Sequence, residues 1–204
     1  MQNAYPEALS ELMELLKSLP GVGKRSSERM ALAVFQWDAD KIAALAENLR
    51  TLKERVKTCT RCGNLAGENA EGLCAVCSSP LRDASSVCVV EEATQIRVIE
   101  ASGVFKGHYH VLGGRIAPLE GKGVESIALE SLERRVESGD IRELILALSS
   151  DVEGQATALY IARRFSGRDL KISCLARGLP AGADLSYADP ATIAAAMNGR
   201  TGLE

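Results

Sequence analysis

Aromatic residues are scarce in this chain of 204 residues, since Phe, Trp and Tyr together make up 4% of it. A core with so few aromatic rings must be built mainly from Leu, Ile, Val and Ala. The sequence also lacks a basic, apolar leader and any apolar run of roughly eighteen residues, so nothing in it indicates a secreted or membrane-spanning protein. We therefore expect a cytoplasmic protein without a membrane partner. Two isolated cysteines, Cys88 and Cys174, fit a reducing compartment.

Histidine is rare and the charge is nearly balanced. The formal net charge of −3 neither favours nor excludes nucleic acid as a partner. Residues 1–57 hold nine basic and eight acidic side chains, whereas residues 83–165 hold nine and thirteen, so the acidic excess lies in the second half. His108 and His110 are the only histidines. Neither has a cysteine nearby in the sequence and no Ser/His/Asp arrangement is visible, so we expect structural roles for both.

Four of the six cysteines, in contrast, stand within nineteen residues and are spaced C-x2-C-x11-C-x2-C. Two Cys-x-x-Cys pairs about a dozen residues apart place four thiolates at the corners of a tetrahedron, the geometry that Zn²⁺ accepts. The Gly- and Asn-rich segment between the pairs is too poor in apolar residues to fold alone, so metal binding would supply the missing free energy. The alternative is disulfides or redox motifs, but no thioredoxin-like pattern surrounds them.

We therefore predict one structural Zn²⁺ per chain. Its ligands are Cys59, Cys62, Cys74 and Cys77. Four sulfur ligands leave no open coordination position, so this zinc should not be catalytic. The other two cysteines, Cys88 and Cys174, stand in apolar runs and are expected to be core thiols.

Hydrophobic periodicity divides the chain into a helical part and an alternating α/β part. Helices are predicted over about 9–19, 24–36 and 40–56, with Asp40 as the cap of the third. Beyond the cysteines, strands are predicted at 87–90, 109–112, 144–148 and 171–175. Helices are predicted between them at 92–101, 124–138 and 153–165, and Asp189-Pro190 opens a last helix. Such alternation predicts a mainly parallel sheet covered on both faces.

A Gly-x-Gly turn, Gly21 to Gly23, separates the first two predicted helices and is followed by Lys24 and Arg25. Glycine lets the backbone approach a ligand, and the next helix offers free N–H groups and its positive dipole end. With two cations added, the turn predicts a binding site for a nucleic-acid phosphate that does not depend on the base sequence. An ordinary capping turn is the alternative, while a P-loop would need different spacing and a preceding strand. The pattern resembles the helix-hairpin-helix motif of DNA-repair proteins.

Acidic residues follow two of the predicted strands. Glu91 and Glu92 come directly after the strand at 87–90, and Asp151 and Glu153 come just after the strand at 144–148. In a parallel sheet these positions share the carboxyl edge, where such carboxylates could hold Mg²⁺ for phosphoryl chemistry. The layout resembles the Toprim domain of topoisomerases, primases and related nucleases. The alternative is that the acids stabilise helix N-termini, and we favour it for Glu92.

The order of these motifs resembles that of the RecR family of bacterial recombination mediator proteins, over essentially the whole chain. Besides the four cysteines, the strongest markers lie at 19–23, 88–91, 109–114, 152–154, 156–157 and 176–180. The family's usual run Asn-Pro-Thr-x-Glu-Gly-Glu-Ala-Thr is replaced at 149–157 by Ser-Ser-Asp-Val-Glu-Gly-Gln-Ala-Thr. Asp151 thus adds a carboxylate and Gln155 removes one, so the partner surface differs from the family pattern.

This resemblance implies a DNA-repair protein that is not an enzyme. RecR-like proteins form ring-shaped tetramers, from dimers joined through their terminal regions, that can surround single- or double-stranded DNA at the nucleoid. They work with RecO, and with RecF at gap boundaries, to load RecA on gapped single-stranded DNA. The resemblance implies that the helix-hairpin-helix lines the DNA channel and that the acidic edge of Glu91, Asp151 and Glu153 docks RecO. The C-terminal segment is similar to a Walker B motif without a P-loop, so ATP hydrolysis is not expected.

We accordingly expect an α+β protein built from four parts. These are a helix-hairpin-helix domain (1–57), a zinc module (58–80), a Toprim domain (81–175) and a Walker B-like segment for oligomerisation (176–204). A function of a different class stays open, a Mg²⁺-dependent Toprim nuclease or a topoisomerase-like enzyme. A topoisomerase needs a nucleophilic tyrosine, and Tyr109, Tyr160 and Tyr187 all lack a recognisable winged-helix context. The sequence therefore favours the scaffold.

Overall fold

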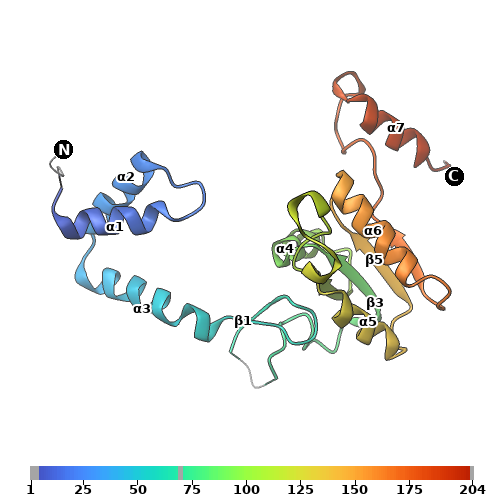
Figure 1. The fold of residues 1–204 in the computed structure, drawn as a ribbon, viewed down its shortest axis with the longest axis horizontal. Helices are drawn as coiled ribbons and strands as arrows, with labels where there is room; N and C mark the ends of the chain where they lie inside the picture. The colour runs from blue at the N-terminus through green and yellow to red at the C-terminus, as the bar shows by residue number, and fades with distance from the viewer. Residues whose placement is uncertain (1–4, 69–70, 203–204) are drawn as a thin grey trace. The chain divides into compact units, whose positions relative to one another are not determined.

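The computed structural model describes residues 5–68 and 71–202 of the chain. The chain forms two compact units, residues 1–55 and 56–204, which we describe one at a time (Figure 1). The described part of the first unit is helical. The second unit combines a two-stranded antiparallel hairpin, a four-stranded parallel sheet and several helices. The predicted combination of a helical part and an α/β part is thereby confirmed. None of the described helices has both the length and the apolar composition needed to cross a membrane.

Three helices make up the first unit, namely α1 (Glu7–Lys17), α2 (Lys24–Phe35) and α3 (Ala39–Arg55). α1 and α2 contact each other as a helical hairpin. Among the residues of this unit that the structure describes, only Ser27 and Ala31 are buried. The unit therefore has almost no core of its own, although its helices carry the apolar stripes predicted from the sequence.

The cap of α3 differs from the prediction. Asp38, not Asp40, precedes the helix, and its Oδ1 accepts a hydrogen bond of 2.8 Å from the N–H of Lys41. The carbonyl of Asp38 also accepts from the N–H of Ile42, which closes the first helical turn. A capping side chain must stand just outside the first turn to reach its free N–H groups. Asp40 instead lies inside that turn, where its charge favours the helix dipole.

A parallel sheet with the strand order β4-β3-β5-β6 forms the body of the second unit. Its strands are β3 (Asp83–Val90), β4 (Gly107–Val111), β5 (Glu143–Ala147) and β6 (Lys171–Cys174). The helices between them are α4 (Ala93–Ser102), α5 (Leu129–Glu137) and α6 (Val152–Arg164). All pairs in this sheet are parallel, with Val87 beside both Leu144 and His108, so the predicted parallel sheet is confirmed.

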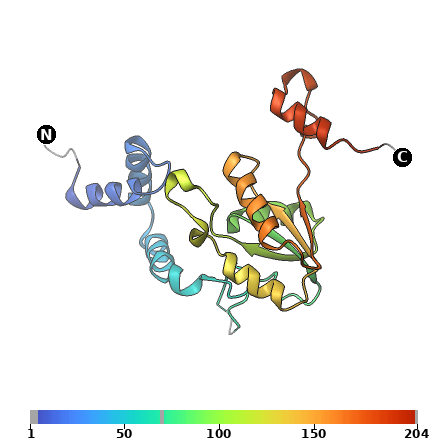
Figure 2. The same cartoon turned by 45° about the vertical axis from the view of Figure 1, so that its right-hand side comes forward.

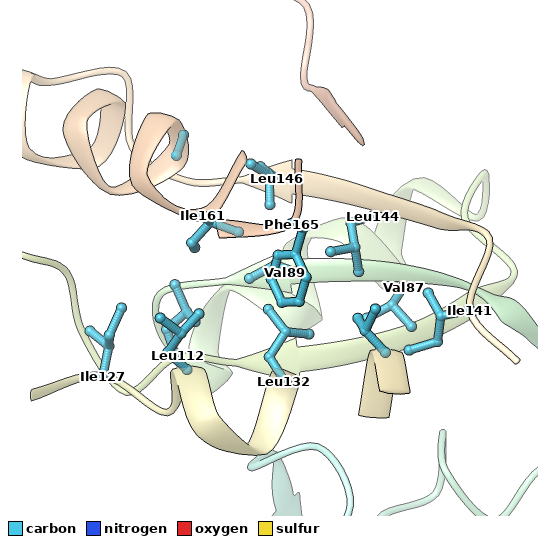
Figure 3. Close-up of a cluster of buried hydrophobic side chains, with 13 residues drawn as sticks. Val87, Val89, Leu112, Ile127, Leu132, Ile141, Leu144, Leu146, Ile161 and Phe165 are labelled. Atoms are coloured by element: carbon cyan, nitrogen blue, oxygen red, sulfur yellow. The ribbon is translucent and has the colours of Figure 1, made fainter. Parts of the chain in front are cut away.

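Each face of the sheet has its own apolar cluster. On one face α5 and α6 pack against β3 and β5, and the side chains of Leu132, Ile161 and Phe165 meet those of Val87 and Val89 (Figures 2 and 3). On the other face α4 contributes Ile96 beneath β3 and β4. Because successive residues of a strand point to opposite faces, a strand buried on both faces is apolar throughout. The run at 87–90 has this composition.

Two predictions about this unit are wrong. The helix predicted at 124–138 is a 3-10 turn η2 (Val124–Ser126) followed by the shorter α5, because Ile127 takes an extended conformation and enters the core. The second concerns Cys174, which is exposed, whereas Cys88 is buried as predicted. β6 is an edge strand of the sheet, and Cys174 is its last residue. Burial raises the pKa of Cys88 to about 12.

The C-terminal segment follows β6 and ends in α7 (Pro190–Asn198), after a 3-10 turn η3 (Leu185–Tyr187). Asp189 caps α7 as predicted, since its Oδ1 accepts from the N–H groups of Ala191 and Thr192 at 2.9 and 3.0 Å. Gly178 lies against Ala196, so the segment folds back on itself. None of its described residues, 175–202, is buried.

Candidate functional site

The four clustered cysteines form the most complete site in the second unit. Their sulfur atoms all lie within 4.8 Å of one another and all four residues are buried. Cys62 Sγ and Cys74 Sγ are 3.6 Å apart, and all four cysteines are free thiols. A tetrahedral site with metal–sulfur distances of about 2.3 Å has edges of about 3.8 Å, so the sulfur set fits a tetrahedral metal ion. The structure thus supports a metal site and not the disulfide alternative.

A short hairpin and two glycine turns bring these sulfurs together. β1 (Lys57–Thr58) pairs with β2 (Leu65–Ala66), and between them the N–H of Gly63 donates to the carbonyl of Cys59 at 3.0 Å. Gly63 has φ 78°, a conformation that glycine adopts without steric cost. A Cβ at this position would also lie 3.1 Å from Cβ of Val111. Glycine therefore allows both the tight turn and the close approach of the module to the sheet.

The protonation of these thiols reflects their crowding. Burial raises the pKa of Cys59, but nearby backbone N–H groups, those of Cys74 first, outweigh it and bring the pKa down to about 7. The hydrogen bond with Cys77 raises the pKa of Cys62, and burial raises it further. Four buried thiolates repel one another, so a bound cation is needed to hold all of them ionised.

The cysteine module is attached to the edge of the sheet. The N–H of Val111 in β4 donates to the carbonyl of Cys62 at 2.8 Å, so the module covers part of an otherwise open strand edge. Val76 packs against both the cysteine cluster and the core below α4. The Nη1 atom of Arg61 donates to the carbonyl of Cys77 at 3.0 Å and joins the two knuckles.

The predicted DNA-binding residues lie in the turn between α1 and α2. Gly21 has φ 78°, and Gly23 is the N-cap of α2 with no side chain capping the helix. A Cβ built on either glycine would meet no atom of the described residues within 4 Å, so the backbone is open to a ligand. Lys24 and Arg25 are exposed and make no ion pair with a described residue. The turn thus presents free N–H donors, the positive end of a helix and two cations on one surface.

The carboxyl edge of the sheet gathers the predicted acidic residues. Glu91 is buried, and its two carboxylate oxygens accept from the N–H and the hydroxyl of Ser149 at 2.8 and 2.9 Å. The end of β3 is thereby tied to the end of β5. Glu92 is the N-cap of α4 and forms a reciprocal capping box with Gln95, which confirms its predicted capping role.

Asp151 and Glu153 stand at the start of α6, beside Arg115. Asp151 is the N-cap and accepts from the N–H of Gly154 at 2.8 Å, while its other oxygen pairs with the guanidinium of Arg115. Asp151 raises the pKa of Arg115, and Glu153 and Glu91 add smaller contributions. The structure therefore pairs Asp151 with Arg115, and Glu91 lines one cavity with the same arginine.

Comparison with known proteins decides the family of this chain. Residues 9–53 match the RecR helix-hairpin-helix, residues 85–176 the Toprim domain, and residues 178–201 the RecR C-terminal domain. The chain is 42% identical over 196 residues to recombination protein RecR of Streptomyces avermitilis, covering 96% of this chain and 97% of the relative. Recombination protein RecR of Phenylobacterium zucineum is 43% identical over 198 residues, covering 97% of both chains. The chain belongs to the RecR family.

A third RecR relative also matches nearly the full length of this chain. Recombination protein RecR of Thermobifida fusca is 41% identical over 200 residues, covering 98% of this chain and 99% of the relative. Membership in the RecR family makes this a recombination protein. It confirms the predicted fold class, in which a helix-hairpin-helix, a four-cysteine module, a Toprim domain and a RecR C-terminal segment follow one another.

Sequence reasoning missed the role of Arg115 in this RecR protein. Arg115 stands 36 residues before Asp151, in the loop after β4, and no spacing pattern connects the two. Gly113 and Gly114, just before it, have positive φ values of 79° and 156° and turn the chain towards the acidic edge. A pair of glycines followed by a cation after a strand was the available signal. Both histidines are buried in β4, and their predicted structural roles stay predictions.

Proposed function

We propose that this protein is a non-enzymatic scaffold that binds DNA without sequence preference and helps load RecA on gapped single-stranded DNA, together with RecO and RecF. The N-terminus of α2 carries this proposal: it is capped by Gly23 alone and flanked by exposed Lys24 and Arg25. Free helix N–H groups beside cations bind phosphate oxygens and read no base, which suits DNA of any sequence. Such a protein would act at the nucleoid, in the cytoplasm.

The functions divide among the four predicted parts. The helix-hairpin-helix at 1–57 would contact DNA, and the module at 58–80 would hold one structural Zn²⁺ on its four sulfurs. The Toprim domain at 81–175 would dock a partner, and the segment at 176–204 would join copies of the chain. Zn²⁺ suits the site because an all-sulfur, tetrahedral donor set favours it over harder cations.

The salt dependence of DNA binding tests whether the turn between α1 and α2 is the DNA-binding site. Each phosphate contact to single-stranded DNA contributes about 0.7 to the slope of log affinity against log salt. Replacing both Lys24 and Arg25 by alanine should therefore lower that slope by roughly 1.4 and weaken binding to unrelated oligonucleotides about equally. Fluorescence anisotropy of labelled oligonucleotides measures both quantities. Lys41→Ala, which removes a cation of the same unit outside the turn, is the matched control. Equal DNA affinities of the double variant and the control would exclude this turn as the DNA-binding site.

The apolar stripe of α3 supports assembly into an oligomer. Its residues recur on one face of the helix and are all partly or largely exposed: Ile42 39%, Leu45 39%, Leu49 64%, Leu52 53% and, just beyond the helix, Val56 39%. A continuous apolar stripe of this kind is typical of an interface between chains. A second copy of this chain is the partner we propose, in the dimers that assemble into a tetrameric ring.

The acidic edge is proposed as the docking surface for RecO. Asp151 already pairs with Arg115, and Glu91 already binds Ser149, so two of the three carboxylates are engaged within the protein. Half-buried Glu153 has no hydrogen bond or ion pair through its side chain to a described residue, which leaves it available to a partner's Lys or Arg. Charge complementarity of this kind supplies specificity and speeds association.

Charge reversal separates docking from catalysis. Glu153→Lys should abolish RecO binding, measured by surface plasmon resonance, while metal content, oligomer mass and DNA affinity stay unchanged. Glu130→Lys, an equal charge change at an exposed position of α5, should bind RecO normally. If Glu153→Lys binds RecO as tightly as this control does, the acidic edge is not the docking surface.

The enzymatic alternative predicts a different result. A Mg²⁺-dependent nuclease or topoisomerase would cleave or relax supercoiled DNA in proportion to the amount of wild-type protein, and Glu153→Lys would abolish the activity. Tyr109 is a poor candidate nucleophile because it is buried and its hydroxyl donates to Glu100 at 2.6 Å. The scaffold predicts that supercoiled DNA survives prolonged incubation with protein and Mg²⁺.

A further inference from the structure

A cavity of about 580 Å³ lies where the cysteine module meets β4 and α5, all within the second unit. Basic and hydroxyl side chains dominate its lining, which includes Thr60, Arg61, His108, Ser131, Arg134 and Arg135. Asp140 is the single carboxylate among the lining residues. Three guanidinium groups, an imidazole and three hydroxyls, the third from Ser138, therefore surround a space that is large enough for a small anion.

The three arginines of this cavity differ from the five described arginines that form ion pairs. Arg50, Arg82, Arg115, Arg164 and Arg168 each form an ion pair with a carboxylate. Arg61 and Arg135 instead donate to backbone carbonyls, those of Cys77 and Tyr109, at 3.0 and 2.7 Å. Within residues 5–68 and 71–202, neither of them nor Arg134 pairs with a carboxylate. None of the three charges is therefore held in a direct ion pair, and Asp140 is the one carboxylate in the same lining.

His108 provides an independent observation at the same place. It is 6% exposed and lines the cavity, and its buried Nε2 has no hydrogen-bond partner among the described residues. His110, on the same face of β4, is satisfied, because its Nε2 lies 2.9 Å from the carbonyl of Ala128 and its Nδ1 lies 3.3 Å from Arg135. An unpaired polar atom in a buried position is unfavourable unless a ligand or water supplies its partner.

We infer that this cavity binds a phosphate group. Guanidinium groups recognise phosphate through paired N–H donors, and hydroxyls and an imidazole can complete the set of hydrogen bonds. The shared chemistry is a phosphate oxyanion, and two sources can supply it: a backbone phosphate of DNA, or a free phosphate. The first source rests on the proposed DNA-binding function, whereas the second does not depend on it.

The competing explanation involves the metal centre. Four thiolates on Zn²⁺ carry a net negative charge, which attracts neighbouring cations. Burial lowers the pKa of Arg135, whereas Cys77 and Cys62 raise it, so this arginine does feel the sulfur cluster. Arg134 lines the same cavity, and its side chain has no hydrogen bond or ion pair to a described residue. Arg134 is therefore the residue that distinguishes a phosphate site from a set of counterions.

Histidine resonances offer a local readout, since the chain has only two histidines. The metal-loaded, full-length protein is titrated with sodium phosphate, and separately with sodium chloride, at constant pH and ionic strength. Long-range ¹H–¹⁵N spectra of the imidazoles follow both rings, with His108→Gln used for assignment. We expect a saturable shift of His108 with phosphate, a much smaller shift of His110, and no saturable shift with chloride.

Arg134→Gln and Arg163→Gln form a matched pair. Both remove one guanidinium from the second unit, but Arg163 is exposed on α6 and does not line the cavity. We expect Arg134→Gln to weaken phosphate binding about tenfold, the effect of losing one charge-assisted hydrogen bond, and Arg163→Gln to leave it unchanged. Metal analysis and circular dichroism of both variants confirm that the site and fold persist.

DNA affinity then identifies the source of the phosphate. If the source is DNA, Arg134→Gln binds an oligonucleotide more weakly than Arg163→Gln, also in the Lys24→Ala/Arg25→Ala background, and phosphate competes with the oligonucleotide. If it is free phosphate, the two variants bind DNA equally while only Arg134→Gln loses the His108 response. The inference is overturned if His108 shows no saturable shift, or if both variants respond like the wild type. The arginines would then be counterions of the metal centre only. The proposed DNA-binding site at the N-terminus of α2 would still stand after that result.

Discussion

The two units of this protein differ in how far they bury their apolar side chains. In the second unit Leu132, Ile161 and Phe165 are at most 1% exposed and pack against both strands and helices (Figure 3). In the first unit Phe35 is 73% exposed and Leu49 is 64% exposed, although both belong to amphipathic helices. A helix is stabilised mainly by burying its apolar face. The comparison indicates that the second unit is held by its own core, whereas the described first unit leaves much of its apolar surface exposed, as expected under the proposed assembly of chains.

Within the second unit the cysteine module resembles the first unit more than it resembles the sheet. Its cluster of buried residues consists of the four cysteines and Ala66, with Leu73 and Val76 packed against them. So small an apolar cluster supplies little stabilisation, and a metal ion on the four sulfurs would supply the rest. Under the proposed function, three sources of stability would coexist in one chain: an apolar core, a metal ion and a partner chain.

Removing a metal ligand should have the largest effect. Cys62→Ser should abolish stoichiometric zinc, because zinc binding supplies about 10 kcal/mol or more to such modules. Hydrogen exchange should then accelerate over residues 58–80 and at the Val111 amide, which bonds to Cys62, while α1 and α2 keep their protection. Elemental analysis measures the metal, and Cys174→Ser, at the exposed cysteine, is the control. Full zinc content in Cys62→Ser would disprove the four-cysteine site.

Truncating a core leucine should have the next largest effect. Leu132→Ala should lower the free energy of unfolding of the second unit by about 3 kcal/mol, whereas Leu49→Ala should change that of the first by less than about 0.5 kcal/mol in a dissociated chain. Trp37 is the only tryptophan, so its fluorescence follows the first unit, and the histidine resonances follow the second. Equal shifts of both probes in urea would show that the units unfold together, against the comparison.

Acid should destabilise the second unit selectively, because both histidines lie in it. Burial lowers the pKa of His110 to about 4, from an ordinary value of 6.5. Between these values the unfolded chain binds a proton that the folded chain does not, so stability falls as the pH falls from about 6.5 towards 4. We expect a loss of about 2 kcal/mol at pH 5 relative to pH 7.

Replacing His110 by glutamine, which does not titrate, isolates the contribution of this histidine to the pH dependence of stability. His110→Gln should lack this 2 kcal/mol of pH dependence, while any acid-induced loss of metal affects both proteins alike. Urea titrations at pH 7 and pH 5, with metal content measured in parallel, give the comparison. Identical pH dependence in the two proteins would mean that His110 is not held neutral by its burial.

A charge on the exposed stripe of α3 should have the smallest effect on unfolding and a large effect on assembly. Leu49→Glu should change the unfolding free energy of the isolated chain by less than about 0.5 kcal/mol, because the side chain is exposed. Its mass in solution, from light scattering, should nevertheless fall to that of a smaller oligomer. Glu54→Gln, also exposed on α3, is the control. An unchanged mass would mean that the stripe is not the interface.

The fold was predictable where local patterns carry the information. The strand at 87–90 and the last helix opened by Asp189-Pro190 occur as expected, because an apolar run and a capping pair act over a few residues. The errors arose where a local sequence pattern fits more than one structural outcome. Asp38 replaced Asp40 as the cap of α3, since two acids near a helix start look alike in sequence. Cys174 proved exposed because an apolar run does not reveal which strand lies at the edge of the sheet.

By itself the sequence determined the four-cysteine metal site, the Gly21–Gly23 turn and the alternation of strands and helices. Each depends on spacings of a few residues, over which chain geometry is nearly fixed. Only the tertiary structure decided that Arg115 pairs with Asp151, that Glu91 binds Ser149, and that His108 joins Arg61 and Arg134 around one cavity. These residues lie tens of positions apart in the chain. Their proximity follows from the strand order and from the packing of α5 and the cysteine module on the sheet, which no local pattern encodes.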